Sequence, residues 1–278
     1  LFCLVWFSTN STRTGVAAGY STCRWAGVRP PQTMFRDIGE MALLFGRTLR
    51  ALPFIWRQRR KVFDQFFEVG NASLFMVCVL SFFIGAVIAL QSGPVLVERG
   101  IGNFLGGIVG ITIAKELAPV MMAILIAGRN GSAMAAEIGS MRVYQEIDAL
   151  RTMNINPIHY LVLPRMVALA TALPMLVTIS IMVGWFGGAV VAAHNAHIAI
   201  GFQAFFDNLR DIVSLEDVVH GVFKSFIFAL IVGTVSCHQG LITRGGPRGI
   251  GRSVTKAVVN SIVLIVIFDY FLTRMLVS

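Results

Sequence analysis

An adjacent lysine and glutamate, Lys115 and Glu116, interrupt a long apolar run at residues 104–128. A charge inside an apolar segment costs roughly 3 kcal/mol on insertion scales, so it persists where water, a partner or a polar ligand receives it. Neighbouring residues on a helix do not face each other, so each of these side chains needs another partner. The pair is therefore either a structural ion-pair arrangement or a polar spot in a cavity that receives a ligand head group.

A third charge, Asp269, lies inside the last apolar run, at residues 256–276. The same cost argument applies to it. Two alternatives stay open. The carboxylate pairs with Lys115 or another basic group, or it stabilises a dimer as a structural intramembrane charge.

The sequence shows no convincing catalytic, metal-binding or nucleotide-binding motif. The run 246–253 reads GxxxxGRS, but a phosphate-binding loop has lysine where this chain has Arg252, and it follows a strand. His194 and His197 have no third ligand nearby, and the four cysteines lack metal-ligand spacing. We therefore expect no catalytic residue, no metal and no directly bound cofactor, so that any ATP hydrolysis belongs to a separate subunit.

Composition places these residues in a membrane protein. Of the 278 residues 56% are hydrophobic and only 13% are charged, with a mean hydropathy of +0.75. Too few charges are present to cover a water-facing surface, which excludes an ordinary soluble domain and a disordered chain. Continuous apolar runs of about twenty residues predict helices rather than the short alternating strands of a barrel.

The predicted fold is an all-α integral membrane protein with an N-terminal amphipathic interfacial helix and five transmembrane helices. About 20 residues cross a hydrocarbon core of about 30 Å. The expected spans are residues 72–91, 104–128, 158–192, 219–241 and 256–276.

The N-terminal part of the chain has two distinct segments. Residues 1–33 are rich in Ser, Thr, Gly and Arg and form an atypical segment. We expect either that the native protein begins at Met34 or that these residues form a disordered tail. Residues 34–278 form one domain. Within it, residues 34–57 carry an apolar stripe opposite basic residues, a pattern typical of a helix lying on a membrane surface.

The distribution of basic residues predicts the orientation. The net charge is +9, but arginines and lysines gather before the first span and in the segments 129–157 and 242–256. Such segments face the cytoplasm, which places the N-terminus inside and the C-terminus outside. The pattern favours a membrane surface over a nucleic acid as the reason for the charge.

The polar segment 129–157 predicts a cytoplasmic coupling element. Val143, Ile147 and Leu150 fall at helical spacing, and polar residues occupy the other faces. A short amphipathic helix of this kind docks into a partner's groove. The alternative is a helix that merely lies on the membrane, which the acids on its polar face disfavour.

Two long motifs resemble one family. The run AGRNGSAMAAEIGSMRVYQEIDAL, preceded by KELAPVMMAILI, resembles the signature of the MlaE/YrbE permeases of MCE-type lipid transporters. CHQGLITRGGPRGIGRSVTKAVVNSIVLIVIFD resembles the second block of that family. The resemblance covers residues 35–278.

The resemblance implies the membrane subunit of an ABC transporter in a bacterial inner membrane. It implies a homodimer, a cytoplasmic ABC ATPase that binds ATP and Mg, and a periplasmic MCE-domain protein. It also implies movement of phospholipids or related lipids between the inner membrane and the outer envelope, which maintains outer-membrane lipid asymmetry.

The resemblance also implies site residues. Lipid-binding positions are Leu96, Lys115, Glu116 and Leu117. ATPase-coupling positions are Glu137, Arg142, Val143, Glu146, Ile147, Asp148 and Leu150.

Two other functions compete with this one. A secondary transporter or channel for a small or amphipathic solute predicts activity without an ATPase. A membrane-embedded lipid enzyme needs a convergent acid/base or metal set, and the sequence shows none. The lipid species, the transport direction and the MCE partner are left open by the sequence.

Overall fold

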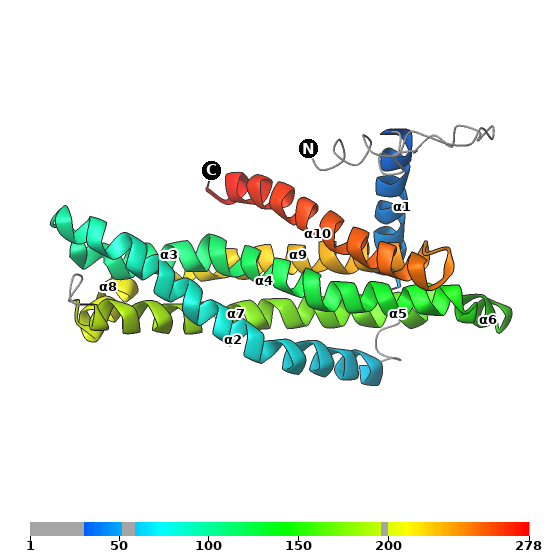
Figure 1. Cartoon of the computed structure of the whole chain (residues 1–278), viewed down its shortest axis with the longest axis horizontal. Helices are drawn as coiled ribbons and strands as arrows, with labels where there is room; N and C mark the ends of the chain where they lie inside the picture. The colour runs from blue at the N-terminus through cyan, green and yellow to red at the C-terminus, as the bar shows by residue number, and fades with distance from the viewer. Residues whose placement is uncertain (1–30, 52–58, 196–199, 278) are drawn as a thin grey trace, which may run out of the picture. The chain divides into compact units, whose positions relative to one another are not determined.

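The computed structural model describes residues 31–51, 59–195 and 200–277, with side chains described from 39 to 276 within these ranges. Helices account for the regular structure of these residues, and no strand occurs among them. Contacts divide the chain into two units, Leu1–Ile38 and Gly39–Ser278. Apart from the first residues of α1 (Pro31–Arg50), the helices described below belong to the second unit. Figure 1 shows their order along the chain.

Among the residues that the structure describes, five helical segments are long and apolar enough to cross a membrane, which confirms the predicted all-α membrane fold. Every predicted span lies within one of them. They are α2 (Arg59–Glu98), the continuous run Gly102–Val143, the run Ile158–His194 that contains α7 (Leu163–His194), α9 (Leu215–Leu241) and α10 (Gly246–Val277).

The second segment is much longer than predicted, because its helix continues from residue 128 to Val143. It comprises a 3₁₀ turn (η2, Gly102–Phe104), α3 (Leu105–Thr112), a π-helical turn (η3, Ile113–Leu117), α4 (Ala118–Ile126), a second π-helical turn (η4, Ala127–Gly131) and α5 (Ser132–Val143).

Polar side chains in the extension, residues 129–143, form hydrogen bonds with other helices. These contacts explain why the extension is helical rather than a solvated loop. The Arg129 guanidinium donates to the carbonyl oxygen of Ala72 on α2. The Ser73 hydroxyl donates to Asn130 Oδ1 over 3.1 Å. Buried polar groups need such partners, so the polarity of residues 129–143 reflects packing between helices.

The predicted interfacial helix is present as α1 (Pro31–Arg50). It begins three residues earlier than expected and ends at Arg50, and the predicted extension over residues 52–57 lies outside the described residues. From Gly39 onward, Leu44, Thr48 and Ala51 are buried on one face. Leu43 and Leu49 are 63% and 45% exposed, so part of the apolar surface of α1 is exposed among the described residues.

Small residues let α2 and α7 pack closely over much of their length (Figure 1). The Ser81 hydroxyl donates to Ser180 Oγ over 2.7 Å. One turn further, a Cβ at Gly85 would fall 2.7 Å from the carbonyl carbon of Gly184. Only glycine permits this approach between two backbones.

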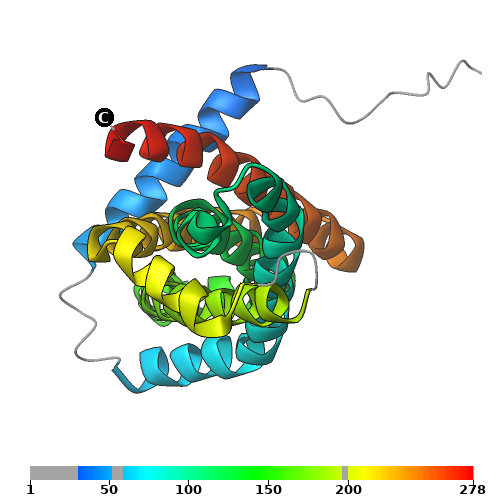
Figure 2. The same ribbon diagram turned by 90° about the vertical axis from the view of Figure 1, so that its left-hand side faces the viewer.

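α8 (Phe202–Ile212), shown in yellow in Figure 2, lies between the predicted spans 158–192 and 219–241. Its buried residues Phe205 and Leu209 pack on α3. The Asn208 side chain accepts the backbone N–H of Gly107 over 2.9 Å. A helix therefore covers the start of the second membrane segment.

Candidate functional site

Lys115 and Glu116 lie on the π-helical turn η3, and a proline two residues after that turn leaves a backbone acceptor open. Pro119 has no N–H and cannot bond to the carbonyl four residues earlier, that of Lys115. The ammonium group of Lys224 on α9 donates to this oxygen over 3.2 Å. The break in the backbone ladder therefore creates part of a cation site inside the membrane segments.

Lys115 itself pairs with the start of α9. Its Nζ lies 2.8 Å from Asp217 Oδ1. Asp217 is also the N3 residue of a capping box whose N-cap is Ser214. Its Oδ2 accepts the backbone N–H of Ser214 over 3.0 Å, and the Ser214 hydroxyl accepts the N–H of Asp217. The capping box therefore fixes the position of the Asp217 carboxylate, which also pairs with Lys115.

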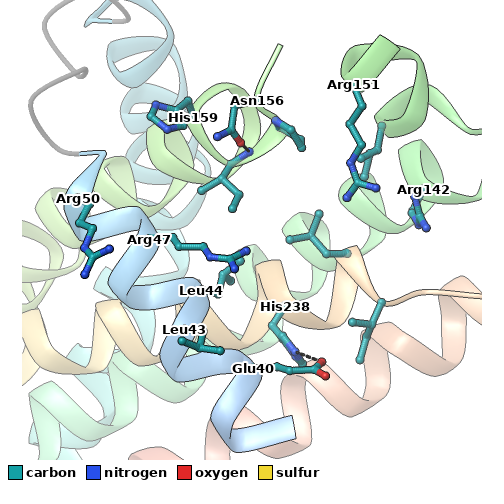
Figure 3. Close-up of a pocket in the computed structure, with 15 residues that line it drawn as sticks. Glu40, Leu43, Leu44, Arg47, Arg50, Arg142, Arg151, Asn156, His159 and His238 are labelled. Carbon is teal, nitrogen blue, oxygen red and sulfur yellow. Dashed lines mark hydrogen bonds and ion pairs between the residues drawn. The ribbon is translucent and has the colours of Figure 1, made fainter. Parts of the chain in front are cut away.

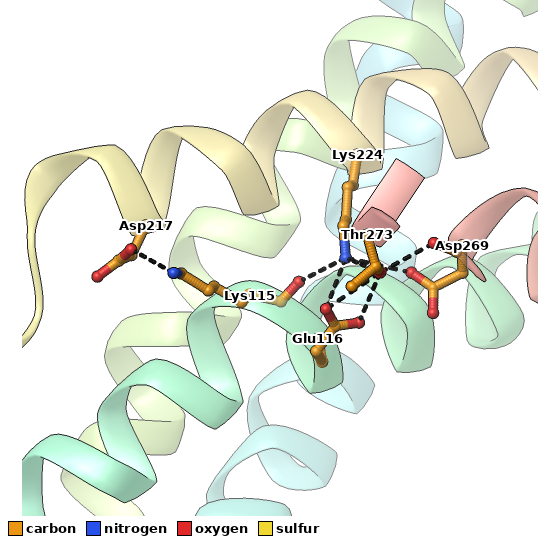
Figure 4. Close-up of polar contacts among 6 residues, drawn as sticks. All are labelled: Lys115, Glu116, Asp217, Lys224, Asp269 and Thr273. Atoms are coloured by element: carbon orange, nitrogen blue, oxygen red, sulfur yellow. Dashed lines mark hydrogen bonds and ion pairs between the residues drawn. The ribbon is translucent and has the colours of Figure 1, made fainter. Parts of the chain in front are cut away.

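Glu116 pairs with a different lysine. Lys224 Nζ lies 2.8 Å from Glu116 Oε1 and 3.4 Å from Asp269 Oδ1. It also donates to Thr273 Oγ1 over 2.7 Å, and the Thr273 hydroxyl lies 3.2 Å from Glu116 Oε1. The contacts join η3, α9 and α10 around one ammonium group (Figure 4).

These contacts identify the ion-pair partners that the sequence left open. Lys115 pairs with Asp217 and Glu116 with Lys224. Asp269 pairs with Lys224, so its basic partner is a group other than Lys115. We call Lys115, Glu116, Asp217, Lys224, Asp269 and Thr273 the charge cluster.

A small pocket of about 200 Å³ opens beside the charge cluster. Its lining residues are Lys115, Glu116, His220, Lys224, Thr273 and Leu276. The Lys115 side chain is 34% exposed and that of Glu116 is 39% exposed, whereas Lys224 is 3% exposed. Lys224 is therefore a buried cation that holds the cluster together. Lys115 and Glu116 present a positive and a negative charge to the pocket.

The other two predicted lipid-binding residues do not line this pocket. Leu96 lies near the end of α2, half-buried against the main hydrophobic core. Leu117 is half-buried and ends η3. The structure brings together the two charged members of the predicted set and separates them from Leu96.

Sequence reasoning missed Asp217, Lys224 and Thr273. Lys224 is a lone charge in the apolar run 219–241, so the cost argument that singled out Lys115 would have found it. Asp217 lies three residues after a serine that precedes an apolar run, which is the sequence signature of a capping box. Thr273 carries no signal of its own.

The predicted coupling residues occupy two helices instead of one. α5 ends at Val143, Gln145 adopts a left-handed φ of 63°, and α6 spans Glu146–Thr152. The expected face formed by Val143, Ile147 and Leu150 is therefore broken by the bend. Such a φ value in a non-glycine residue is uncommon and marks a sharp change of direction.

The apolar residues of α6 face this chain. Ile147 is fully buried in a cluster that includes Ile138 and Met166, and Leu150 packs against it. The apolar side of α6 is thus already occupied, and the surface that remains is its polar side together with Tyr144, which is 68% exposed. In this conformation the Ile147 side chain is covered by other residues of this chain, so the coupling role predicted for it stays a prediction.

The charged coupling candidates differ in what they contact. Asp148 Oδ1 lies 2.7 Å from Arg142 Nη1 and also contacts Arg151, so it ties α6 to the end of α5. Glu137 pairs with Arg165 of α7 over 2.7 Å. Glu146 is exposed in the first turn of α6, which leaves it as the coupling candidate best placed to meet another protein.

The phosphate-loop-like run 246–253 forms the first turns of α10 and follows α9 after a short turn. A phosphate-binding loop requires a loop between a strand and a helix. The run is therefore a helix start.

Comparisons with known proteins place the charge cluster and the α5–α6 bend in a matched region. The family model described as Permease MlaE matches residues 62–275. A probable ABC transporter permease protein of Synechocystis sp. is 39% identical over 215 residues, covering 77% of this chain and 81% of that protein. One from Rickettsia typhi is 36% identical over 77% of this chain and 82% of its own length.

A plant protein is also similar. TRIGALACTOSYLDIACYLGLYCEROL 1, chloroplastic, of Arabidopsis thaliana is 35% identical over 214 residues. The match covers 77% of this chain and 61% of that protein.

Proposed function

This chain belongs to the MlaE permease family, and from that premise we propose that it moves phospholipids or related lipids across the cell envelope. It is a multi-pass membrane protein and a transporter permease subunit. ATP is hydrolysed by a separate ATPase subunit with bound Mg, and this chain supplies the lipid pathway.

One observation carries the lipid proposal: the pocket beside the charge cluster pairs a half-exposed cation with a half-exposed anion inside membrane segments. A zwitterionic head group matches this pattern, because its phosphate suits Lys115 and its ammonium suits Glu116. Acyl chains then run along neighbouring apolar surface, where burial is worth about 0.8 kcal/mol per CH₂. The Arabidopsis relative is named after a diacylglycerol lipid, which agrees with a lipid cargo.

The partners follow the same proposal. The ATPase contacts the exposed side of the α5–α6 bend, and an MCE-domain protein receives lipid on the opposite side. A second copy of this chain covers the exposed apolar residues of α10, such as Val263, Phe271 and Met275. The protein lies in the bacterial inner membrane with the basic segments facing the cytoplasm.

The test is photo-crosslinking and transport in liposomes that contain the permease, its ATPase and labelled lipid. A photoreactive residue at 116 should capture lipid during turnover. One at Met182, 61% exposed on α7, should give only the background of bulk lipid. Lys115→Gln should lower ATP-dependent lipid transport at least tenfold while the complex still assembles.

Two results would count against the proposal. Equal crosslinking at 116 and 182 with normal transport by Lys115→Gln would make the charge cluster structural. Solute movement driven by an ion gradient without the ATPase would favour a secondary transporter or channel.

A further inference from the structure

A larger pocket, of about 780 Å³, lies between α1, α6, the turn before α7 and the end of α9 (Figure 3). Its lining is strongly basic. Arg47 and Arg50 reach it from α1, Arg142 and Arg151 from the α5–α6 bend, and His159 and His238 complete the ring. All of these residues belong to the unit Gly39–Ser278.

The acids near this pocket balance only part of its charge. Asp148 is shared by Arg142 and Arg151. Glu40 lies 3.7 Å from Nε2 of His238. Among the described side chains, no carboxylate forms an ion pair with Arg47 or Arg50, so the pocket keeps a positive potential that attracts an anion.

Exposed apolar residues beside these arginines indicate that the anion belongs to a lipid. Leu43 and Leu49 flank the α1 arginines and are 63% and 45% exposed. Leu43, Leu44 and Ile158 line the pocket itself. Arginines beside exposed leucines on an amphipathic helix match the boundary between head groups and acyl chains better than an aqueous surface.

We propose that this pocket binds the phosphate of an anionic phospholipid head group from the cytoplasmic leaflet. Arginine guanidinium groups donate pairs of hydrogen bonds to phosphate oxygens, and four arginines line this pocket. The lipid wedges between α1 and the α5–α6 bend and holds the two together. This site shares no residue with the pocket at the charge cluster and does not depend on the transported cargo.

The test measures lipid retained by the full-length protein in nanodiscs of phosphatidylcholine with a minor fraction of phosphatidylglycerol, read by native mass spectrometry. The variant is Arg47→Gln with Arg50→Gln. The matched control is Arg59→Gln with Arg60→Gln, which removes two exposed arginines of α2 that do not line the pocket. The pocket variant should retain about tenfold less phosphatidylglycerol, and the control should retain it as the unaltered protein does.

A conservative variant separates charge from folding. Arg47→Lys with Arg50→Lys should keep more than half of the retained lipid, which shows that the glutamine effect is not misfolding. Equal losses in the pocket and control variants would mean general attraction to a basic surface and would overturn the site.

Two further outcomes would overturn the lipid assignment. Displacement of phosphatidylglycerol by millimolar inorganic phosphate would make the ligand a soluble phosphate. Loss of ATPase co-purification with unchanged lipid retention in the pocket variant would make the basic pocket a docking surface for an acidic protein segment.

Discussion

The ammonium group of Lys224 lies 2.8 Å from the carboxylate of Glu116. The same group donates to the carbonyl oxygen of Lys115, the acceptor that Pro119 leaves open. The Lys224–Glu116 pair is asymmetric, because Lys224 is 3% exposed and Glu116 is 39% exposed. Removal of Glu116 would leave the buried Lys224 without its nearest carboxylate and lower the stability of the fold. Glu116 itself faces the pocket. Stability and function therefore depend on the same ion pair in different ways.

Glu116→Leu should destabilise the protein, even though it removes a charge from a membrane segment. The substitution leaves the buried Lys224 with Asp269, Thr273 and one carbonyl, and we expect a loss of about 2 kcal/mol. Glu116→Gln keeps an acceptor and should cost less. The measurement is thermal unfolding of purified protein in detergent.

The triple variant Glu116→Leu with Lys224→Met and Asp269→Leu provides the control, because Lys224 pairs with both carboxylates. Replacing all the charged members of such a cluster by apolar groups is often neutral, so we expect most of the lost stability to return. If Glu116→Leu alone were as stable as the unaltered protein, Lys224 would not need this carboxylate.

The sequence predicted the membrane fold because the apolar runs and basic segments are each strong signals. It also predicted that Lys115 and Glu116 need separate partners, since that follows from helix geometry alone. It did not identify the partners. The partners depend on which helices pack together and on the position of each residue along the packed helices. The pairing of Lys224 with Asp269, for example, joins residues 45 apart in the chain.

The α5–α6 region shows why periodicity failed there. Val143, Ile147 and Leu150 have helical spacing, but the left-handed Gln145 interrupts the helix between the first and the second of them. No glycine or proline marks that bend. Its geometry is accompanied by tertiary contacts, namely the burial of Ile147 and the Arg142–Asp148 ion pair, which local sequence patterns do not encode.

Gly85→Ala should destabilise the packing of α2 on α7. The added Cβ would meet the backbone of Gly184, which cannot move without shifting a whole helix, so we expect a loss of about 1–3 kcal/mol. Gly70→Ala on the same helix meets nothing within 4 Å and should be neutral or slightly stabilising. Parallel unfolding curves test this, and equal stability of the two variants would contradict the close approach.

The proposed orientation predicts a labelling pattern in cells. In a variant whose native cysteines are replaced by serine, a cysteine at Ser278 should react with an impermeant thiol reagent from outside. A cysteine at Ser253, in the basic segment, should react only after the membrane is opened. The reverse pattern would invert the topology and move the basic pocket to the outer surface.

Two acidic residues in the first turn of α6, Glu146 and Asp148, differ in what they contact, although a charge-reversal experiment on both would treat them alike. Asp148 bonds to Arg142 and Arg151, so Asp148→Lys should loosen the bend and lower stability by about 1 kcal/mol. Glu146 is exposed, so Glu146→Lys should change stability by less than about 0.5 kcal/mol. Its effect should instead appear in the contact with the ATPase.

Glu146→Lys should therefore reduce ATPase co-purification, or uncouple ATP hydrolysis from transport, at normal expression. Glu216→Lys is the matched control, because Glu216 is also an exposed glutamate in the first turn of a helix. It lies at the start of α9, between the predicted spans 158–192 and 219–241, on the side expected to face away from the cytoplasm. The control variant should leave ATPase binding intact. Reversing a charge at a docking surface acts mainly through repulsion of the partner, so high salt should partly restore binding by Glu146→Lys. Full coupling in Glu146→Lys at low salt would place the ATPase contact elsewhere on the chain.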